Sequence, residues 1–219
     1  MLRFVLPAML AISLTGCGAI GYSLTANLPG SGQPTGKAPR VKTADTAGTG
    51  FKTKVAAATA VDQASDKAPK GSFEKAPAGA LSGRDYTATK LDAEVARDLV
   101  NAYRKTKGLQ PLKLQPNLTA AARAHSRDLA KWDRISHFGS DGSNPLDRVK
   151  RAGYKAKLAA ENVGTGQVTI QEVIKGWKAS PGHNKNLLLA DAEHMGIALV
   201  RDPKTEFKTF WTLVIASPR

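Results

Sequence analysis

The sequence predicts an α+β domain built in layers, because segments with helical periodicity are followed by β-rich segments near the C-terminal end. The late segments MGIALVRD (195–202) and KTFWTLVIAS (208–217) favour strands, and PKTE (203–206) between them is typical of a hairpin. Apolar residues recur at helical spacing in the chain before them. We therefore expect three or four helices and a small, mainly antiparallel sheet in residues 86–219, which is enough chain to bury a core.

The first two expected helices each carry an apolar stripe. Residues 91–108 end at Gly108, a suitable helix stop, and their stripe consists of Val95, Leu99, Ala102 and Tyr103. Residues 116–133 begin at Asn117, a residue that caps helices well. Their stripe consists of Leu118, Ala121, Ala122, His125, Leu129 and Trp132.

Two more helices are expected from their end signals. In SNPLDRVKRAGY (143–154), Asn144 is a cap, Pro145 suits the first helical position and Gly153 suits the stop. In TIQEVIKGW (169–177), Thr169 and Glu172 have the spacing of a capping box. The stripe of this last helix consists of Ile170, Val173, Ile174 and Trp177.

The beginning of the chain predicts export. Arg3 precedes an apolar run from residue 4 to residue 14, which is typical of a signal peptide over residues 1–16 and is too short to span a bilayer. The letters LTGC (14–17) resemble the lipobox of bacterial lipoproteins, which directs cleavage before the cysteine and its acylation with chains such as palmitate. We expect Cys17 to anchor the protein to a membrane, and Gly18 favours the outer membrane in a diderm organism. An ordinary signal peptide is the alternative.

Residues 17–85 are expected to form a disordered tether that follows the lipidated cysteine. They are rich in Ala, Gly, Thr, Lys and Pro, with few large apolar residues and no periodicity, so they cannot bury enough surface to offset their ordering entropy. Such a chain spans on the order of 45 Å. It would hold the domain of residues 86–219 away from the membrane.

The net charge of +14 favours anionic partners such as lipid headgroups or cell-wall polymers. The basic residues are spread along the chain and accompany no nucleic-acid-binding motif, so a nucleic-acid partner is not expected. Cys17 is the sole cysteine, which excludes an internal disulfide framework.

Four segments carry the residues with chemical potential. His125 lies in AHSRDLA, His137 in ISHFGSDGSNPLDR, Glu161 in AAENVGTG, and both Ser180 and His183 in KASPGHNKNLL (178–188). Together with HMGIALV and WTLVIA, these motifs in this order resemble the CAP superfamily of cysteine-rich secretory, antigen 5 and pathogenesis-related proteins. The resemblance covers about residues 88–217 and is closest to the bacterial secreted, disulfide-free branch.

The resemblance implies an α-β-α sandwich with a central cavity lined by two histidines and two acidic residues. By position, His137, Glu161 and His183 match three members of that set. Ser180 stands where many relatives have the fourth, an acidic residue, so the set is incomplete here. His125 belongs to the bacterial pattern and is expected to line the same region, as is Ser180.

Two imidazoles and a carboxylate can hold Zn²⁺ or another divalent ion with positions open for water. They also suit general acid–base chemistry without a metal. The same residues equally fit a hydrogen-bonded network that only fixes a loop. Histidines and a glutamate from distant segments match no protease signature, and Ser180 lacks a nucleophile-elbow pattern, so no catalytic residue is assigned.

We therefore expect a monomeric, membrane-tethered binding module for a small-molecule, lipidic or cell-wall ligand, rather than an enzyme. The first alternative is a metal-dependent hydrolase of peptide, peptidoglycan or nucleic acid, with His137 and His183 as ligands and Glu161 as ligand or base. The second is a structural protein of the envelope.

Overall fold

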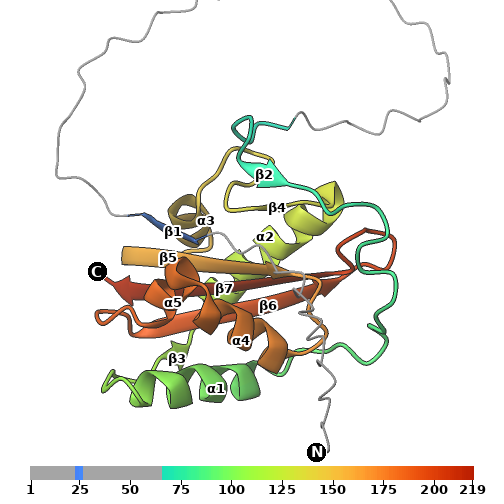
Figure 1. Cartoon of the computed structure of the whole chain (residues 1–219). Helices are drawn as coiled ribbons and strands as arrows, with labels where there is room; N and C mark the ends of the chain where they lie inside the picture. Colours follow the sequence, from blue (N-terminus) through green and yellow to red (C-terminus); the bar gives the residue numbers. More distant parts are fainter. Residues whose placement is uncertain (1–22, 27–65) are drawn as a thin grey trace, which may run out of the picture.

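The computed structural model describes residues 23–26, in their backbone, and residues 66–219. The predictions for the signal peptide, Cys17 and most of the tether lie outside these residues. A five-stranded sheet forms the middle of the molecule, with strand order β1-β5-β7-β6-β3 (Figure 1). Neighbouring strands are antiparallel except β3, which pairs parallel with β6. The strands are β1 Ser23–Ala26, β3 Lys113–Leu114, β5 Ala156–Thr165, β6 His194–Arg201 and β7 Thr209–Pro218.

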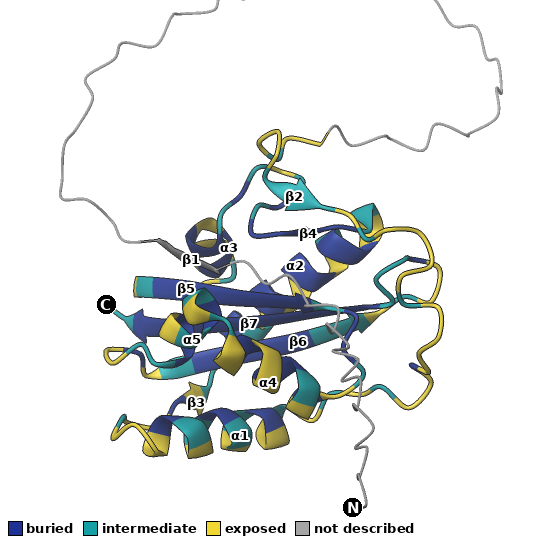
Figure 2. Cartoon of the chain, in the orientation of Figure 1, coloured by how far each residue is buried: buried dark blue, intermediate teal, exposed yellow. Residues whose placement is uncertain are grey.

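Helices cover both faces of this sheet, which confirms the expected three-layer sandwich. One core cluster joins the first face to α1 (Ala93–Lys105), α4 (Ile170–Ala179) and α5 (Pro181–Leu187). A second cluster joins the other face to α2 (Pro116–Trp132) and α3 (Pro145–Arg151). Strands β5, β6 and β7 are mostly buried between the layers, whereas the helices expose their outer sides (Figure 2). None of the helices in the described part of the chain combines the length and apolar character needed to cross a bilayer.

The central strand β7 supplies side chains to both layers by the alternation of its residues. Trp211, Leu213 and Ile215 belong to the cluster under α1, α4 and α5. Val214 and Ala216 belong to the cluster under α2 and α3. The β6–β7 hairpin that the sequence predicts is confirmed by antiparallel pairing from His194↔Ala216 to Arg201↔Thr209.

Gly196 lets α2 lie directly against β6. A Cβ at this position would be 2.1 Å from the Thr119 nitrogen and 2.2 Å from the Leu118 carbonyl carbon, both of them backbone atoms. Only glycine permits this approach. The close contact fixes the start of α2 over the sheet and so places the later residues of that helix, including His125.

Most expected helix ends are confirmed. Asn144 caps α3 in a capping box with Asp147, and Thr169 caps α4. The N-cap of α2 is Gln115 rather than Asn117, because the side chain of Gln115 accepts a hydrogen bond from the Asn117 nitrogen and Pro116 starts the helix.

The short helix α5 is an addition to the elements that the sequence predicts. Ser180 ends α4 and also precedes α5, and Pro181 takes the first helical position, so Pro-Gly starts a helix here rather than returning the chain through a turn.

The buried face of α1 is rotated from the predicted stripe. Val95 is 41% exposed, whereas Ala96, Val100 and Arg104 are buried. The guanidinium of Arg104 donates to the carbonyl oxygens of Leu187 and Leu189 at 2.8 and 3.0 Å. These hydrogen bonds direct the Arg104 side of α1 toward the core. A prediction based on apolar residues does not detect a buried arginine.

Residues 66–85, which the sequence assigns to the tether, lie on the domain. The short strand β2 (Phe73–Glu74) pairs antiparallel with β4 (Ile135–Ser136). The carboxylate of Asp66 pairs with the buried Arg134, and Arg84 pairs with Glu172 at 2.6 Å. These contacts are polar or made by the backbone, so they leave no hydrophobic periodicity in the sequence. They extend the ordered domain from the expected start near residue 86 back to Asp66.

Candidate functional site

Glu161 on β5 lies at the centre of a buried polar cluster. Its side chain is fully buried against the α2–α3 layer. One carboxylate oxygen, Oε1, is 3.0 Å from His137 Nδ1 and 3.5 Å from His125 Nε2. The other, Oε2, accepts a hydrogen bond from Arg148 Nη2 at 2.7 Å. We call these four residues the Glu161 cluster.

Three elements position the partners of Glu161. His125 is on the buried face of α2, and its Nε2 lies 2.8 Å from the carbonyl oxygen of Ser136. His137 directly follows β4. Arg148 on α3 also donates to the carbonyl oxygens of His137 and Ser143, at 3.0 and 2.8 Å. The arginine therefore fixes the His137 loop as well as the carboxylate.

Burial disfavours the ionised form of Glu161, whereas the neighbouring side chains favour it. Burial raises the pKa of the Glu161 carboxyl, but Arg148, with the two histidines, outweighs this and holds the pKa well below its usual range. Burial lowers the pKa of His125 to about 4, despite the nearby Glu161 carboxylate. At neutral pH the cluster therefore contains a carboxylate, a guanidinium and a neutral His125.

His183 lies on α5, in the layer on the other side of the sheet. Its carbonyl oxygen accepts from Asn162 Nδ2 at 3.1 Å, and Asn162 follows Glu161 on β5. Burial, with the charge of His137, lowers the pKa of His183 to about 4. Its Nε2 has no hydrogen-bond partner within residues 66–219. The structure thus brings His125 and His137 to Glu161, while His183 makes no hydrogen bond or ion pair with that carboxylate in the described chain.

The expected metal ligands do not fit a divalent ion in this arrangement. Among the described residues, no group of three or more His, Cys, Asp or Glu side chains is placed to hold a metal. The guanidinium of Arg148 bonds one carboxylate oxygen of Glu161, and its positive charge would repel a cation there. Zinc binding therefore stays a prediction that this geometry does not favour.

Ser180 and His194 have local structural surroundings. Ser180 joins α4 to α5 and does not line either of the two hollows described below. His194 begins β6, as the sequence predicts, and its Nδ1 lies 2.8 Å from the hydroxyl of Tyr154.

Arg148 is the member of the cluster that sequence reasoning missed. It lies on the buried face of α3, between Leu146 and Val149. The available signal was electrostatic: a glutamate buried in the apolar, glycine-rich segment AAENVGTG needs a cation beside it.

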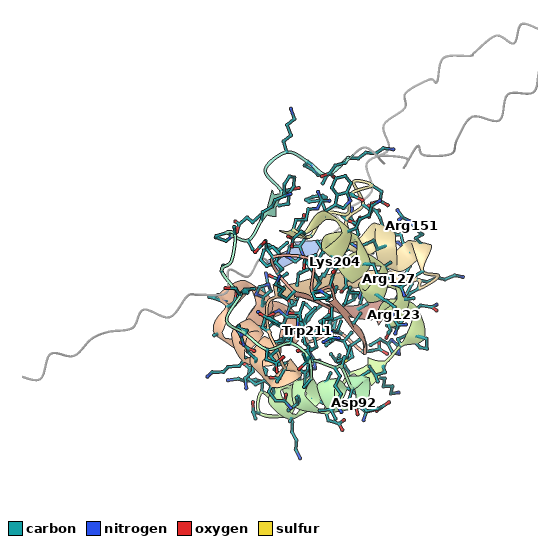
Figure 3. All side chains as sticks on the ribbon, turned by 90° about the vertical axis from the view of Figure 1, so that its right-hand side faces the viewer. Asp92, Arg123, Arg127, Arg151, Lys204 and Trp211 are labelled. Carbon is teal, nitrogen blue, oxygen red and sulfur yellow. The ribbon has the colours of Figure 1, made fainter. Side chains whose placement is uncertain are left out.

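A hollow of about 390 Å³ opens between α2, α3 and the loop of residues 139–143. Its wall includes His125 and Arg148 of the Glu161 cluster, and its rim includes Asp128, Asp141 and Arg151. A second hollow of about 450 Å³ runs along α2 and shares Ala120 and Ala124 with the first. Arg123, Arg127 and Arg151 lie along this side of the molecule (Figure 3).

The sequence matches a known protein family and resembles two proteins of Bacillus subtilis. Residues 97–215 match the cysteine-rich secretory protein family, CAP. The chain is 36% identical over 115 residues to the uncharacterized protein YkwD of Bacillus subtilis, covering 52% of this chain and 43% of that protein. It is 29% identical over 109 residues to the uncharacterized membrane protein YlbC of the same organism, covering 50% and 32%. The match thus spans less than half of either relative.

Solved structures show the same fold. An extracellular protein containing a SCP domain from Bacillus anthracis superposes with a TM-score of 0.51 at 25% identity, covering 57% of this chain and 39% of that one. An outer surface protein from Borrelia burgdorferi gives a TM-score of 0.54 at 19% identity, covering 59% and 98%. These neighbours are extracellular or surface proteins. Since the family match covers more than half of the sequence, the chain belongs to the CAP family of cysteine-rich secretory proteins.

Proposed function

We propose that this protein is an envelope-tethered binding module whose ligand occupies the hollow between α2 and α3. The observation that carries the proposal is that His125 and Arg148 belong both to the wall of this hollow and to the Glu161 cluster. The cluster then acts as a rigid polar support for the binding surface. Buried hydrogen-bonded networks are well suited to that role, and in this one His125 Nδ1 and Arg148 Nε have no hydrogen-bond partner within residues 66–219.

The state of Glu161 supports binding over hydrolysis. A general base needs a free lone pair directed at a water or substrate proton. Both oxygens of Glu161 face donors of the protein, and the carboxyl is fully buried. Its lowered pKa also makes it a weak base.

The composition of the hollow indicates a ligand with an anionic group and an apolar part. Arg151 lines this hollow, where it pairs with Asp141, and Arg123 and Arg127 line the adjoining second hollow. The exposed guanidinium groups of these arginines suit phosphate or carboxylate. The floor along α2 includes the methyl groups of Ala120, Ala121 and Ala124. An anionic envelope lipid or lipid-linked polymer combines these properties, and the net charge of +14 would favour its approach.

Attachment through an acylated Cys17 is part of the proposal. It rests on the LTGC motif, and it would confine the domain to the surface where such ligands occur. Metabolic labelling with a palmitate analogue tests it, with Cys17→Ser as the matched variant. Equal labelling of both chains would exclude acylation at this cysteine.

The binding site is tested by filling the hollow. Ala124 is exposed and borders both hollows, so Ala124→Trp should block them without disturbing the core. Ala102→Trp, on the exposed side of α1, is the matched control. Binding of a water-soluble, short-chain phosphatidylglycerol to the full chain carrying Cys17→Ser is measured by calorimetry, with short-chain phosphatidylcholine for comparison.

We expect saturable binding of the anionic lipid, weakened at least tenfold, or about 1.4 kcal/mol, by Ala124→Trp and unchanged by Ala102→Trp. Equal binding of the two lipids, or equal binding by both tryptophan variants, would refute the proposed site. No binding of the lipid or of isolated envelope polymers would refute the function and favour a structural role.

A further inference from the structure

The outer edge of β5 holds a strand that the rest of the fold does not require. β1 pairs antiparallel with β5 in the register Ser23↔Asn162 to Ala26↔Ala159. β5 is also paired along its other side with β7, which continues through β6 to β3. In Figure 1, β1 lies beside β5 at the margin of the sheet. Removing β1 would leave the other four strands joined.

β1 is also separated from the domain along the chain. A stretch of 39 residues, 27–65, lies between it and the next described residue, Asp66. Its attachment to β5 therefore gains from the high effective concentration of a tethered strand.

The edge is bounded and lined by specific polar groups. Trp177 Nε1 donates to the carbonyl oxygen of Val163 at 3.1 Å, so that acceptor is already used at one end of the edge. Asn186 on α5 donates to the carbonyl oxygen of Glu161 at 3.0 Å and to Asn162 Oδ1 at 2.9 Å. The side chains of α5 thus engage β5 at the same residues that pair with β1.

His183 adds a buried polar atom at this place. Its carbonyl oxygen is bonded by Asn162, one of the residues that pair with β1, and α5 contacts β1 as well as β5. The residue is 1% exposed, and its Nε2 lacks a hydrogen-bond partner within residues 66–219. A buried ring nitrogen without a partner is unfavourable, so a bound chain that supplied one would be stabilised.

We propose that the β5 edge between residues 156 and 162, flanked by α5 and His183, binds an extended peptide segment of another protein, and that β1 is the internal competitor for this site. An added strand gains affinity from main-chain hydrogen bonds. The partner is an extended segment with small or β-branched residues, free of proline at the paired positions, like the SLTA of β1 itself. Since neither hollow along α2 is lined by a β5 residue, this proposal is independent of the function proposed above.

The experiment compares three versions of the full chain. In the first, Leu24→Pro and Thr25→Pro remove two backbone donors from β1. The matched control places the same two prolines at Thr46 and Ala47, and the third chain is unmodified. Hydrogen exchange of the β5 amides is followed by mass spectrometry. The probe is a synthetic peptide with the sequence of residues 19–30, AIGYSLTANLPG, added at concentrations up to the millimolar range.

We expect those amides of residues 159–162 that face β1 to exchange at least tenfold faster in the β1 proline variant than in the other two chains, whereas those bonded to β7 keep their protection. The peptide should bind that variant saturably and restore the protection, and the unmodified chain should need at least tenfold more peptide. Equal exchange in all three chains would overturn the assignment of β1 as the occupant. A peptide that binds none of them, or all of them equally, would overturn the strand-binding site.

Discussion

Replacing Arg148 by methionine tests whether the Glu161 cluster is held together by a buried ion pair. Methionine keeps much of the length and apolar volume of the side chain but removes the guanidinium. That group lies 2.7 Å from Glu161 Oε2 and also donates to the carbonyl oxygens of His137 and Ser143. The arginine side chain is only 6% exposed, so water cannot replace it without rearrangement of α3.

The expected loss of stability is about 3–5 kcal/mol, the cost of removing one partner from a buried pair. The remaining carboxylate should respond by binding a proton, since its pKa would rise above that of the unfolded chain once Arg148 is gone. A raised carboxyl pKa contributes stability at low pH, so the loss caused by Arg148→Met should be smaller at pH 5 than at pH 7. The double variant Arg148→Met/Glu161→Gln, without either charge, should recover at least about 1 kcal/mol.

Urea unfolding followed by tryptophan fluorescence gives these free energies. The matched control is Arg151→Met, one turn later on the same helix, where the arginine is 64% exposed and pairs with a half-exposed Asp141. An exposed pair contributes about 0–1 kcal/mol. If Arg148→Met costs no more than Arg151→Met, the cluster is not organised by its buried charge, and the account of Glu161 given above is wrong.

Two further predictions concern pH and packing. The free energy of unfolding should fall as the pH drops from about 6.5 to about 4. In this range the unfolded chain binds protons at His125 and His183, whereas their native forms, with pKa values of about 4, do not. The loss is at most about 3 kcal/mol for each histidine. Urea titrations across this range measure it, and a flat profile would contradict it. Gly196→Ala should cost about 3 kcal/mol or more in the same assay, since its Cβ would lie 2.1 Å from the Thr119 nitrogen. Gly176→Ala, which meets nothing within 4 Å on α4, should be neutral or stabilising, and equal effects of the two would count against a close α2–β6 contact.

The sequence predicted burial and secondary structure correctly where they depend only on the local pattern of residues. The stripe Ile170, Val173, Ile174 and Trp177 is buried as a unit, and the β6–β7 hairpin has the expected position. In these segments burial is decided by periodicity, and periodicity is local. The layered α+β class follows from them.

It was less informative where polar groups determine the packing. The buried Arg104 bonds backbone carbonyl oxygens and sets the buried face of α1. Strand pairing and the ion pairs of Asp66 and Arg84 hold residues 66–85 on the domain. The ten-residue strand β5 was also not predicted, because its small residues and its buried Glu161 break any alternating pattern.

The candidate site shows the same limit. Family resemblance selected His137 and Glu161, and both are in the cluster. It also selected His183, which lies on α5 in the layer on the other side of the sheet. It did not select Arg148, because the sequence contains many basic residues and nothing in the local pattern distinguishes this one. Which cation neutralises a buried carboxylate depends on the relative placement of α3 and β5, and one-dimensional spacing does not contain that information.

The position of β7 also bears on how the protein is made. This strand lies in the middle of the sheet yet comes after every other described element in chain order. β5 and β6 have no pairing with each other, so they cannot join one sheet until residues 209–218 have left the ribosome. The described sheet can therefore be completed only once β7 is available to join β5 to β6. Deletion of β7 would therefore separate β5 from β6, whereas deletion of α1 would leave the pairing of these strands intact.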